Sequence, residues 1–351
     1  MRNYKKILGL LLTLTLSFGV VGCGSTSGKN NSKAKEAKVQ QSEEQSQKSG
    51  ELKKVTIAAT GTDGTLTEVA RIAQSKGFFE EELEKVGYTP DYQGFAQAGP
   101  AINEAFAGGT IDVAFYGDLP AVTAKSNGVD IKIIASATSQ LDYAILGVEN
   151  TDIKDVTDLK GKKIAVGFGT VTYKYLDDLL KKNGLTISDV EIVNTSVDGP
   201  AMLSSGQVDA FVTQYGAGVA YQAAKVGKVI FSTKDTPDIA GELILAARND
   251  FLKSDRDAAV AIVKALYGAY NFAKINPDQV YDLVATENFP AEIQKQVYTD
   301  QTFAAFNPEV NDNTKKKLSD IGKYAEDNQL IKSAVNIDDL IDTSISEEVI
   351  K

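Results

Sequence analysis

The chain has 351 residues, a single cysteine, no histidine and a formal net charge of -10 at pH 7. This acidic balance argues against nucleic acid and anionic membrane surfaces as partners, because both require a basic footprint. The absence of histidine excludes histidine-based triads, histidine acid–base catalysis and histidine-ligated zinc. We therefore expect neither an enzyme nor a bound metal or cofactor; an enzyme that uses carboxylates alone stays open but has no motif behind it.

The N-terminus has the three parts of a secretory signal. A basic head at residues 1–6 precedes an apolar stretch at residues 7–22, which ends in glycine. The apolar stretch is short for a membrane span, which needs roughly 20 residues. Its last residues, Val-Val-Gly, run into Cys23 and resemble the bacterial lipobox. We expect residues 1–22 to be a signal peptide and Cys23 to carry the lipid; a buried cysteine after an ordinary signal is the alternative.

A polar segment follows the cysteine. Residues 24–50 are mostly Ser, Lys, Gln, Glu and Asn, a composition that cannot bury enough apolar surface to fold. We expect residues 23–51 to be a lipidated, disordered tether with a reach of about 27 Å. The expected location is therefore extracytoplasmic, at the bacterial cell membrane, through the lipid alone.

The first globular half alternates strand-like and helical segments. Residues 54–59 form an apolar strand pattern, residues 60–64 a turn-rich loop, and residues 66–77 a helix that ends at Gly77. The next expected elements are an extended segment at 88–93, a helix at 100–107, a strand at 111–115, a helix at 119–126 and a strand at 131–135. This order predicts a mainly parallel sheet with helices on both faces.

One sequence unit occurs twice, about a hundred residues apart. Residues 99–115 and residues 199–212 both contain Gly-Pro-Ala-apolar, a short helix, then Gly-x-apolar-Asp and a strand. Proline at the first helical position is common in any fold, so chance is the alternative. The shared Gly-x-apolar-Asp favours two related α/β lobes.

The second half supplies the other lobe and a helical end. Strands are expected at 163–167, 190–193 and 242–247, a long helix at 255–273, and another helix from 276. We expect residues 52–140 plus 247–351 to form lobe 1, residues 141–246 to form lobe 2, and a hinge to join them. The predicted fold class is α/β, two-lobed, with a mainly parallel sheet flanked by helices in each lobe.

Helix starts are the expected binding positions. In open α/β sheets, ligands lie outside the carboxyl ends of the strands, where free helix N–H groups favour an anion. Ordinary capping is the alternative at each position. The candidate ligand-binding residues are Thr60, Thr62, Asp63, Gly99, Pro100, Gly117, Asp118, Thr138, Ser139, Gly169, Thr170, Val171, Thr172, Tyr173, Thr213, Gln214 and Tyr215.

Three of these positions have competing interpretations. The Gly-Phe-Gly at residues 167–169 lacks both the third glycine of a dinucleotide fingerprint and a Gly-Lys-Ser/Thr ending, so we reject a phosphate loop. Asp118 either caps a helix or holds a ligand amine. Tyr215 either closes over a ligand or is a half-exposed loop aromatic.

Several motifs together resemble one family of proteins. Residues 53–300 are similar to the periplasmic-type substrate-binding proteins of ABC importers for aliphatic sulfonates, taurine, nitrate and bicarbonate. The motifs that carry the resemblance are at residues 77–83, 105–113, 117–121, 158–166 and 203–210. The resemblance implies a type II periplasmic-binding-protein fold whose lobes close by a hinge motion over a small anion.

Two motifs depart from the family's sulfonate binders. The family's sulfonate binders usually have the motif Gly-Ser-x-x-His-Tyr at the start of the second-lobe helix. This chain has Gly-Thr-Val-Thr-Tyr there, at residues 169–173, so Thr170 keeps the hydroxyl and the histidine is absent. The sulfonate binders often have Trp-x-Pro-Tyr where this chain has Thr-Gln-Tyr-Gly at residues 213–216. A related branch handles thiamine pyrimidines, but its enzymes need histidine and cysteine.

The resemblance implies a monomeric, lipid-anchored receptor that presents an alkanesulfonate or taurine to an ABC permease. Backbone N–H groups and hydroxyls at Gly99 and residues 170–172 would hold the anionic head, and Asp63 or Asp118 an amine. Nitrate or bicarbonate is one alternative ligand. A heterocycle stacked on Tyr173 and Tyr215 is another, and an envelope-anchored carboxylate hydrolase is the alternative class.

Overall fold

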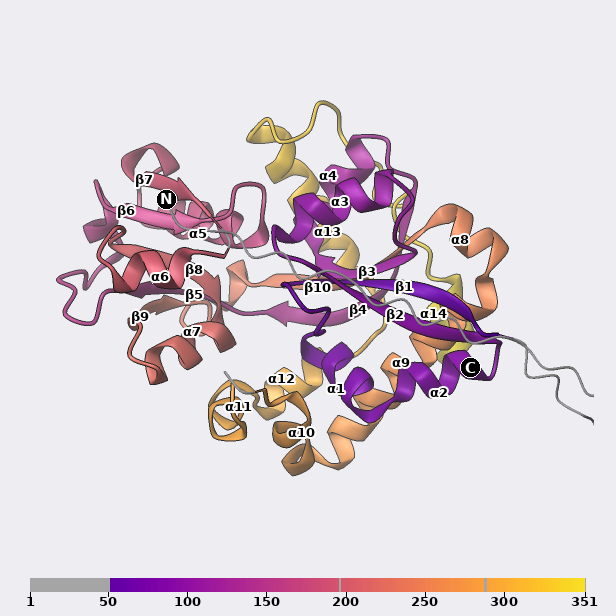
Figure 1. The fold of residues 1–351 in the computed structure, drawn as a ribbon. Helices are drawn as coiled ribbons and strands as arrows, with labels where there is room; N and C mark the ends of the chain where they lie inside the picture. Colours follow the sequence, from indigo (N-terminus) through magenta and orange to yellow (C-terminus); the bar gives the residue numbers. More distant parts are fainter. Residues whose placement is uncertain (1–50, 196, 287–288, 351) are drawn as a thin grey trace, which may run out of the picture. The chain divides into compact units, whose positions relative to one another are not determined.

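The computed structural model describes residues 51–350, except residues 196 and 287–288 (Figure 1). The expected signal peptide, Cys23 and residues 24–50 of the tether lie outside the described residues. Among the described helices, none is both long and apolar enough to cross a bilayer.

The first sheet has the strand order β2-β1-β3-β10-β4. β1 pairs in parallel with β2 and β3, and β10 runs antiparallel to both β3 and β4, so β10 alone opposes the others. The strands are β1 (Lys53–Thr60), β2 (Tyr88–Phe95), β3 (Val113–Gly117), β4 (Ile131–Leu141) and β10 (Gly241–Arg248).

The second sheet repeats this plan with the order β7-β6-β8-β5-β9. β6 pairs in parallel with β7 and β8, and β5 runs antiparallel to β8 and β9. The strands are β5 (Tyr143–Gly147), β6 (Lys163–Val166), β7 (Glu191–Asn194), β8 (Ala210–Gln214) and β9 (Lys228–Ser232). The prediction of two related lobes, each with a mainly parallel sheet, is confirmed.

The aspartates of the repeated motif occupy equivalent places in the two sheets. Asp112 accepts a hydrogen bond from the N–H of Thr56 on β1, at 2.9 Å. Asp209 accepts one from the N–H of Lys163 on β6, at 2.8 Å. Each carboxylate thus satisfies the backbone of the neighbouring parallel strand, which explains why the motif occurs once per lobe.

Helices cover both faces of the first sheet because both of its faces are apolar. Ile57 and Ala59 face a core formed with α1, α2 and α9, whereas Ala58 between them faces a core formed with α3, α4 and α13. Figure 1 shows these two groups on opposite sides of the sheet. The helices are α1 (Glu68–Lys76), α2 (Phe78–Glu84), α3 (Ala98–Ala107), α4 (Asp118–Ser126), α9 (Arg256–Ile275) and α13 (Asp312–Asp327).

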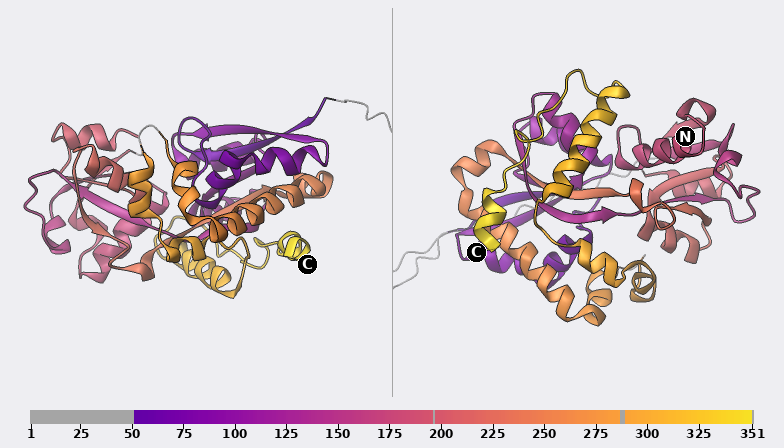
Figure 2. Two further views of the ribbon diagram at one scale, coloured as in Figure 1. Left: turned by 90° about the horizontal axis from the view of Figure 1, so that it is seen from below. Right: turned by 180° about the vertical axis from the view of Figure 1, so that it is seen from behind.

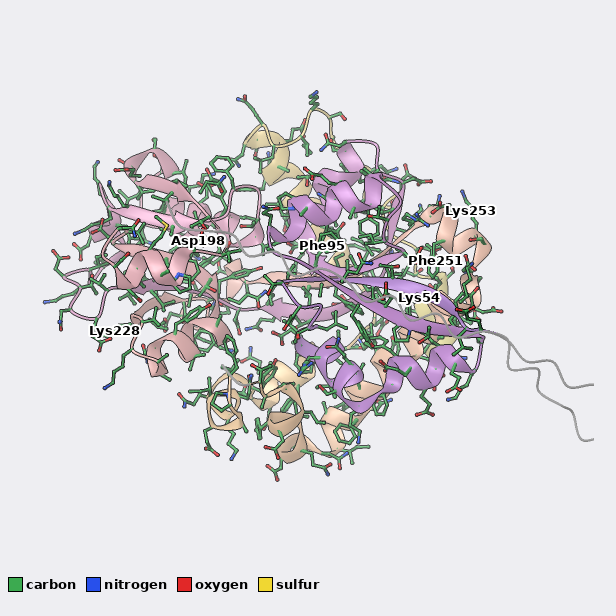
Figure 3. All side chains as sticks on the ribbon, in the orientation of Figure 1. Lys54, Phe95, Asp198, Lys228, Phe251 and Lys253 are labelled. Atoms are coloured by element: carbon green, nitrogen blue, oxygen red, sulfur yellow. The ribbon has the colours of Figure 1, made fainter. Side chains whose placement is uncertain are left out.

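The remaining helices flank the second sheet or follow β10. On α8, Phe251 is buried and Lys253 is exposed, as expected for an amphipathic surface helix (Figure 3). α11 packs against α7 beside the second sheet, whereas α12, α13 and α14 pack against elements of the first lobe, and both views of Figure 2 show the C-terminal helices on the side of the first sheet. These helices are α5 (Val171–Lys182), α6 (Gly199–Ser204), α7 (Tyr215–Ala223), α8 (Asn249–Ser254), α10 (Pro277–Val284), α11 (Ala291–Val297), α12 (Asp300–Ala305) and α14 (Ser344–Ile350).

The chain passes between the sheets twice. Asp142 is the single residue between β4 and β5, and residues 233–240 lead from β9 back to β10. Residues 241–246, which we expected in lobe 2, pair instead with β3 and β4 of the first sheet. The apolar run correctly predicted a strand, but such a run carries no information about which sheet it joins.

Candidate functional site

A large cavity among the described residues has a volume of about 640 Å³. It lies where β1 and β8 end and α1 and α7 begin, and the segment from α10 to α12 closes one side. This is the expected location, outside the carboxyl ends of the strands. Its lining residues are Thr60, Gly61, Thr62, Asp63, Thr65, Leu66, Thr67, Glu68, Arg71, Gln140, Asp142, Gln214, Tyr215, Gly216, Ala217, Tyr221, Val284, Thr286, Phe289, Gln294, Val297, Tyr298 and Thr302.

Two helix N-termini open into this cavity. α1 follows Thr67 and α7 follows Gln214, and neither of these residues makes a side-chain capping hydrogen bond. The first-turn N–H groups of a helix have no partner within the helix and carry a partial positive charge. The two helix starts therefore offer an anion-binding surface from both lobes.

Arg71 is a cation on the wall of the cavity. Its Nη1 donates to Gln74 Oε1 at 3.1 Å, and its Nε is buried without a hydrogen-bond partner. Within the described part of the chain, Arg71 forms no ion pair with a carboxylate. A planar guanidinium with unused donors suits a sulfonate or carboxylate group.

Glu68, the first residue of α1, has a backbone φ of 55°. This left-handed conformation costs a residue with a side chain about 1–2 kcal/mol. Burial raises the pKa of its carboxyl to about 7, repulsion from Asp142 adds to the rise, and Lys234 counteracts it. Glu68 therefore combines a strained backbone with a carboxyl whose pKa is raised above its usual range.

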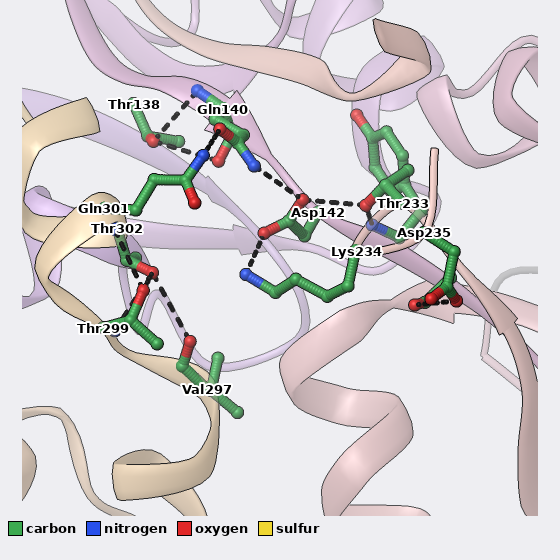
Figure 4. A network of polar contacts seen from close by, with 12 residues as sticks. Thr138, Gln140, Asp142, Thr233, Lys234, Asp235, Val297, Thr299, Gln301 and Thr302 are labelled. Atoms are coloured by element: carbon green, nitrogen blue, oxygen red, sulfur yellow. Dashed lines mark hydrogen bonds and ion pairs between the residues drawn. The ribbon is translucent and has the colours of Figure 1, made fainter. Parts of the chain in front are cut away.

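Asp142 connects the cavity to both crossings between the sheets (Figure 4). Its carboxylate accepts from Thr233 Oγ1 at 2.8 Å and Gln140 Nε2 at 3.3 Å, and pairs with Lys234 Nζ at 2.5 Å. Its backbone oxygen accepts from the N–H of Tyr215, at 2.8 Å. Through these contacts, Asp142 links the end of β4, the β9–β10 connection and the start of α7.

Aromatic rings form much of the remaining wall. Tyr215, Tyr221, Phe289 and Tyr298 line the cavity. The ammonium of Lys234 lies 5.3 Å from the centre of the Tyr215 ring, a cation–π arrangement that fixes the ring. The cavity therefore combines charged groups with an apolar wall, as is typical of small-molecule sites.

The predicted site residues fall into separate groups. Those that line the large cavity are Thr60, Thr62, Asp63, Gln214 and Tyr215. Pro100 lines a second cavity of about 490 Å³, and Asp118 and Val171 line a small one of about 90 Å³. The predicted residues that line none of these three cavities are Gly99, Gly117, Thr138, Ser139, Gly169, Thr170, Thr172, Tyr173 and Thr213.

The starts of α4 and α5 pack against each other rather than around an open space. A Cβ atom on Gly117 would lie 2.3 Å from Val171 Cγ1, so only glycine allows this approach. Thr170 caps α5: its hydroxyl donates to Gly167 O at 2.6 Å and accepts from the N–H of Tyr173 at 3.3 Å. This predicted anion cradle is occupied by the protein's own contacts.

Asp118 has a structural role in the described fold. Its two oxygens accept from the N–H groups of Leu119 and Glu242, at 2.7 and 2.9 Å. Burial raises the pKa of its carboxyl, and the charge of Lys174 lowers it. Asp118 is the first residue of α4 and not its N-cap, which is Gly117, so its carboxylate links the start of α4 to β10; a contact with a ligand amine stays a prediction.

Sequence reasoning missed Glu68, Arg71 and Asp142. Glu68 and Arg71 lie within the helix that the apolar spacing predicted, three residues apart, so they share one helix face. That spacing and the loop before the helix were the available signals. Asp142 gave no local signal, because its importance comes from partners about 90 residues away in the sequence.

Comparison with known proteins supports a common family. The family model described as "NMT1/THI5 like" matches residues 69–280, more than half of the chain. A Bacillus subtilis (strain 168) protein, provisionally named an aliphatic sulfonates-binding protein, is 24% identical over 98% of this chain and 97% of its own length. The taurine-binding periplasmic protein of Escherichia coli (strain K12) is 30% identical over 61% of this chain and 66% of its own.

A solved structure shares the fold. The periplasmic sulfonate-binding protein SsuA from Methylobacillus flagellatus KT superposes with a TM-score of 0.69 and 27% identity. The match covers 86% of this chain and 94% of that one. This superposition agrees with the two five-stranded sheets observed in this chain.

Proposed function

This chain belongs to the NMT1/THI5-like family, and we propose that it is the substrate-binding component of an ABC importer for a small organic sulfonate. The observation that carries the proposal is the cavity of about 640 Å³, which is lined by Arg71 and by two helix starts that lack side-chain caps. The names of its relatives, which are binding proteins for sulfonates and taurine, support the same ligand class.

The number of available donors is sufficient for useful affinity. Hydrogen bonds to a charged group are worth about 1.5–3 kcal/mol each. Three or four of them, less the cost of ordering and lobe closure, support a Kd in the micromolar range, or about -8 kcal/mol. Closure by a hinge motion would follow from tighter binding to the closed form.

Anchoring and delivery complete the proposal. Residues 1–22 would be removed, Cys23 would carry the lipid, and the following tether would keep the receptor near its permease. We expect a Cys23→Ser variant to leave the membrane fraction while keeping its ligand affinity. Recovery of this variant in the membrane fraction, at the wild-type level, would contradict lipid anchoring.

A second candidate ligand is an amine-bearing pyrimidine. The aromatic wall formed by Tyr215, Tyr221, Phe289 and Tyr298 favours it, since ring stacking stabilises a planar ligand. Nitrate and bicarbonate are less well matched, because each would fill only a small part of this volume. A hydrolase is disfavoured because the relatives described above are named for binding.

A ligand panel separates these candidates. We expect 1 mM taurine or ethanesulfonate to raise the thermal midpoint by several degrees, because a ligand at 100 times its Kd stabilises by about 2.7 kcal/mol. Differential scanning fluorimetry with sulfonates, nitrate and an aminopyrimidine measures this shift. A shift with the pyrimidine or nitrate and none with sulfonates would replace the proposed ligand.

A further inference from the structure

Tyr324 of the first lobe contacts two lysines of the second. It lies on α13, which packs against α4 beside the first sheet. The ammonium groups of Lys174 and Lys181 lie 5.0 and 5.3 Å from the centre of its ring, within the range of a cation–π interaction. Both lysines are on α5, which packs against β8 of the second sheet. The ring therefore joins the two lobes.

Charged residues form a stripe along the face of α5 that meets this ring. Lys174 and Lys181 are two turns apart, and two aspartates lie between them at helical spacing. The N–O distance is 2.5 Å between Lys174 and Asp178 and 2.8 Å between Lys181 and Asp177. Lys181 Nζ also donates to Oδ1 of Asn328, the residue that follows α13, at 3.3 Å. A hydrogen bond and two cation–π contacts thus cross between the lobes here.

These contacts lie outside the large cavity. None of the described residues that line the cavity comes from α5 or α13. The residues of α1 and α13 belong to cores on opposite faces of the first sheet. Figure 1 and the right view of Figure 2 show α13 on one side of β4 and β10 and α12 on the other. Tyr324 therefore does not touch a ligand in that cavity.

In the described arrangement, the lobes meet at several places. A Cβ atom on Gly117 of the first lobe would lie 2.3 Å from Val171 of the second, so the starts of α4 and α5 are in contact. On the cavity side, α11 packs against α7, and α11 follows α10, which packs against α1. The lobes are therefore closed around the large cavity.

The contacts of Tyr324 depend on this closed arrangement. Within the described residues, the chain passes between the lobes only at Asp142 and at residues 233–240. A cavity of about 90 Å³ lies among α4, α5 and α13, so the lobes are not packed as one continuous core here. Rotation at the two crossings would separate α5 from α13 and leave each sheet intact.

We propose that Tyr324, with Lys174 and Lys181, forms a latch that stabilises the closed arrangement and so sets ligand affinity without touching the ligand. This inference rests on the proposed function, because it requires a ligand that binds between closing lobes. The free energy of binding includes the free energy of closure. A contact made only in the closed arrangement therefore strengthens the binding of every ligand by the same factor.

The test removes the aromatic ring and keeps an apolar side chain. Leucine has no π face, so Tyr324→Leu loses both cation–π contacts. By titration calorimetry we expect this variant to bind taurine and ethanesulfonate about tenfold more weakly than the wild type does. The ratio of the two affinities should stay unchanged. Tyr324→Phe keeps the ring and should bind both ligands as the wild type does.

A matched control comes from a cation–π contact within one lobe. The ammonium of Lys274 lies 5.0 Å from the centre of the Tyr270 ring, and both residues are on α9. Tyr270→Leu removes the same kind of contact and should leave both affinities unchanged. Thermal unfolding of each variant confirms that the fold is retained.

A measurement without ligand reports on the latch independently. Small-angle X-ray scattering gives the radius of gyration, which increases as the lobes separate. Loss of the latch appears in this radius if the ligand-free protein is mainly closed, and in the affinities if it is mainly open. Tyr324→Leu should therefore differ from the wild type and from Tyr270→Leu in at least one of these measurements.

The outcomes separate this inference from the proposed function. Unchanged affinities together with an unchanged radius would overturn the latch and leave sulfonate binding standing. Tighter binding by Tyr324→Leu, or weaker binding of one ligand alone, would also overturn it. If the wild type binds neither sulfonate at millimolar concentration, the proposed ligand is wrong, and the radius alone decides on the latch: a larger radius upholds it and an equal radius overturns it.

Discussion

Replacing Arg71 by glutamine is expected to weaken sulfonate binding at least a hundredfold. The variant keeps a polar side chain but removes the only charged guanidinium that lines the described cavity. The expected loss corresponds to about 3 kcal/mol, the upper part of the range for hydrogen bonds to a charged group. Titration calorimetry with taurine and ethanesulfonate measures it, and both ligands should lose affinity equally.

An Arg71→Lys variant serves as the control for charge. Lysine keeps the positive charge but lacks the planar pair of donors, so intermediate affinity is expected. Within the described residues, Arg71 makes one side-chain hydrogen bond, to Gln74, so its replacement should change the unfolding free energy little. Wild-type affinity in Arg71→Gln would show that the anion binds elsewhere in the molecule.

Replacing Asp142 by alanine is expected to destabilise the fold by about 2–3 kcal/mol. The Asp142 side chain is 12% exposed, and the change removes the acceptor for Thr233 and leaves Lys234 without its partner. Loss of one member of a largely buried charged pair leaves the other uncompensated. Urea unfolding followed by circular dichroism gives the change in unfolding free energy.

Asp142→Asn is the matched control. The amide keeps an oxygen that can accept from Thr233 but loses the ion pair with Lys234, so a loss of about 1 kcal/mol is expected. Because the charge of Asp142 contributes to the raised pKa of Glu68, both variants should also lower that pKa. Unchanged stability in Asp142→Ala would mean that the crossing does not depend on this network.

The sequence was sufficient to predict the architecture because the signals for it are local or repeated. Apolar spacing and Gly77 located α1, whose cap at Gly77 has a φ of 72°. The Gly-x-apolar-Asp repeat predicted two lobes, and the aspartates prove to have the same backbone partner in each. The strand at 242–247 was predicted, but its residues up to 246 were assigned to lobe 2 although they pair with β3 and β4, since pairing partners are not encoded locally.

The lining of the large cavity was predicted only in part, for a physical reason. Helix starts identified Thr60, Asp63 and Tyr215, which line the large cavity. The same reasoning selected Thr170, whose hydroxyl is used inside the protein. A helix start shows where donors are available, but long-range packing decides whether a ligand or a neighbouring side chain meets them.

The aromatic wall illustrates the same limit. Phe289 and Tyr298 come from the C-terminal segment, more than 200 residues after α1, and reach the cavity only in the folded chain. The sequence offered an alternation of helices there and no binding motif. This part of the cavity wall therefore comes from residues that no local pattern identifies.

Titration calorimetry of the purified protein with taurine at pH 8 tests the central claim most directly. We predict one site per chain with a Kd in the micromolar range, and loss of the binding heat in Arg71→Gln. Absence of binding heat for taurine and for ethanesulfonate at millimolar concentration would contradict the claim that the cavity captures a small sulfonate.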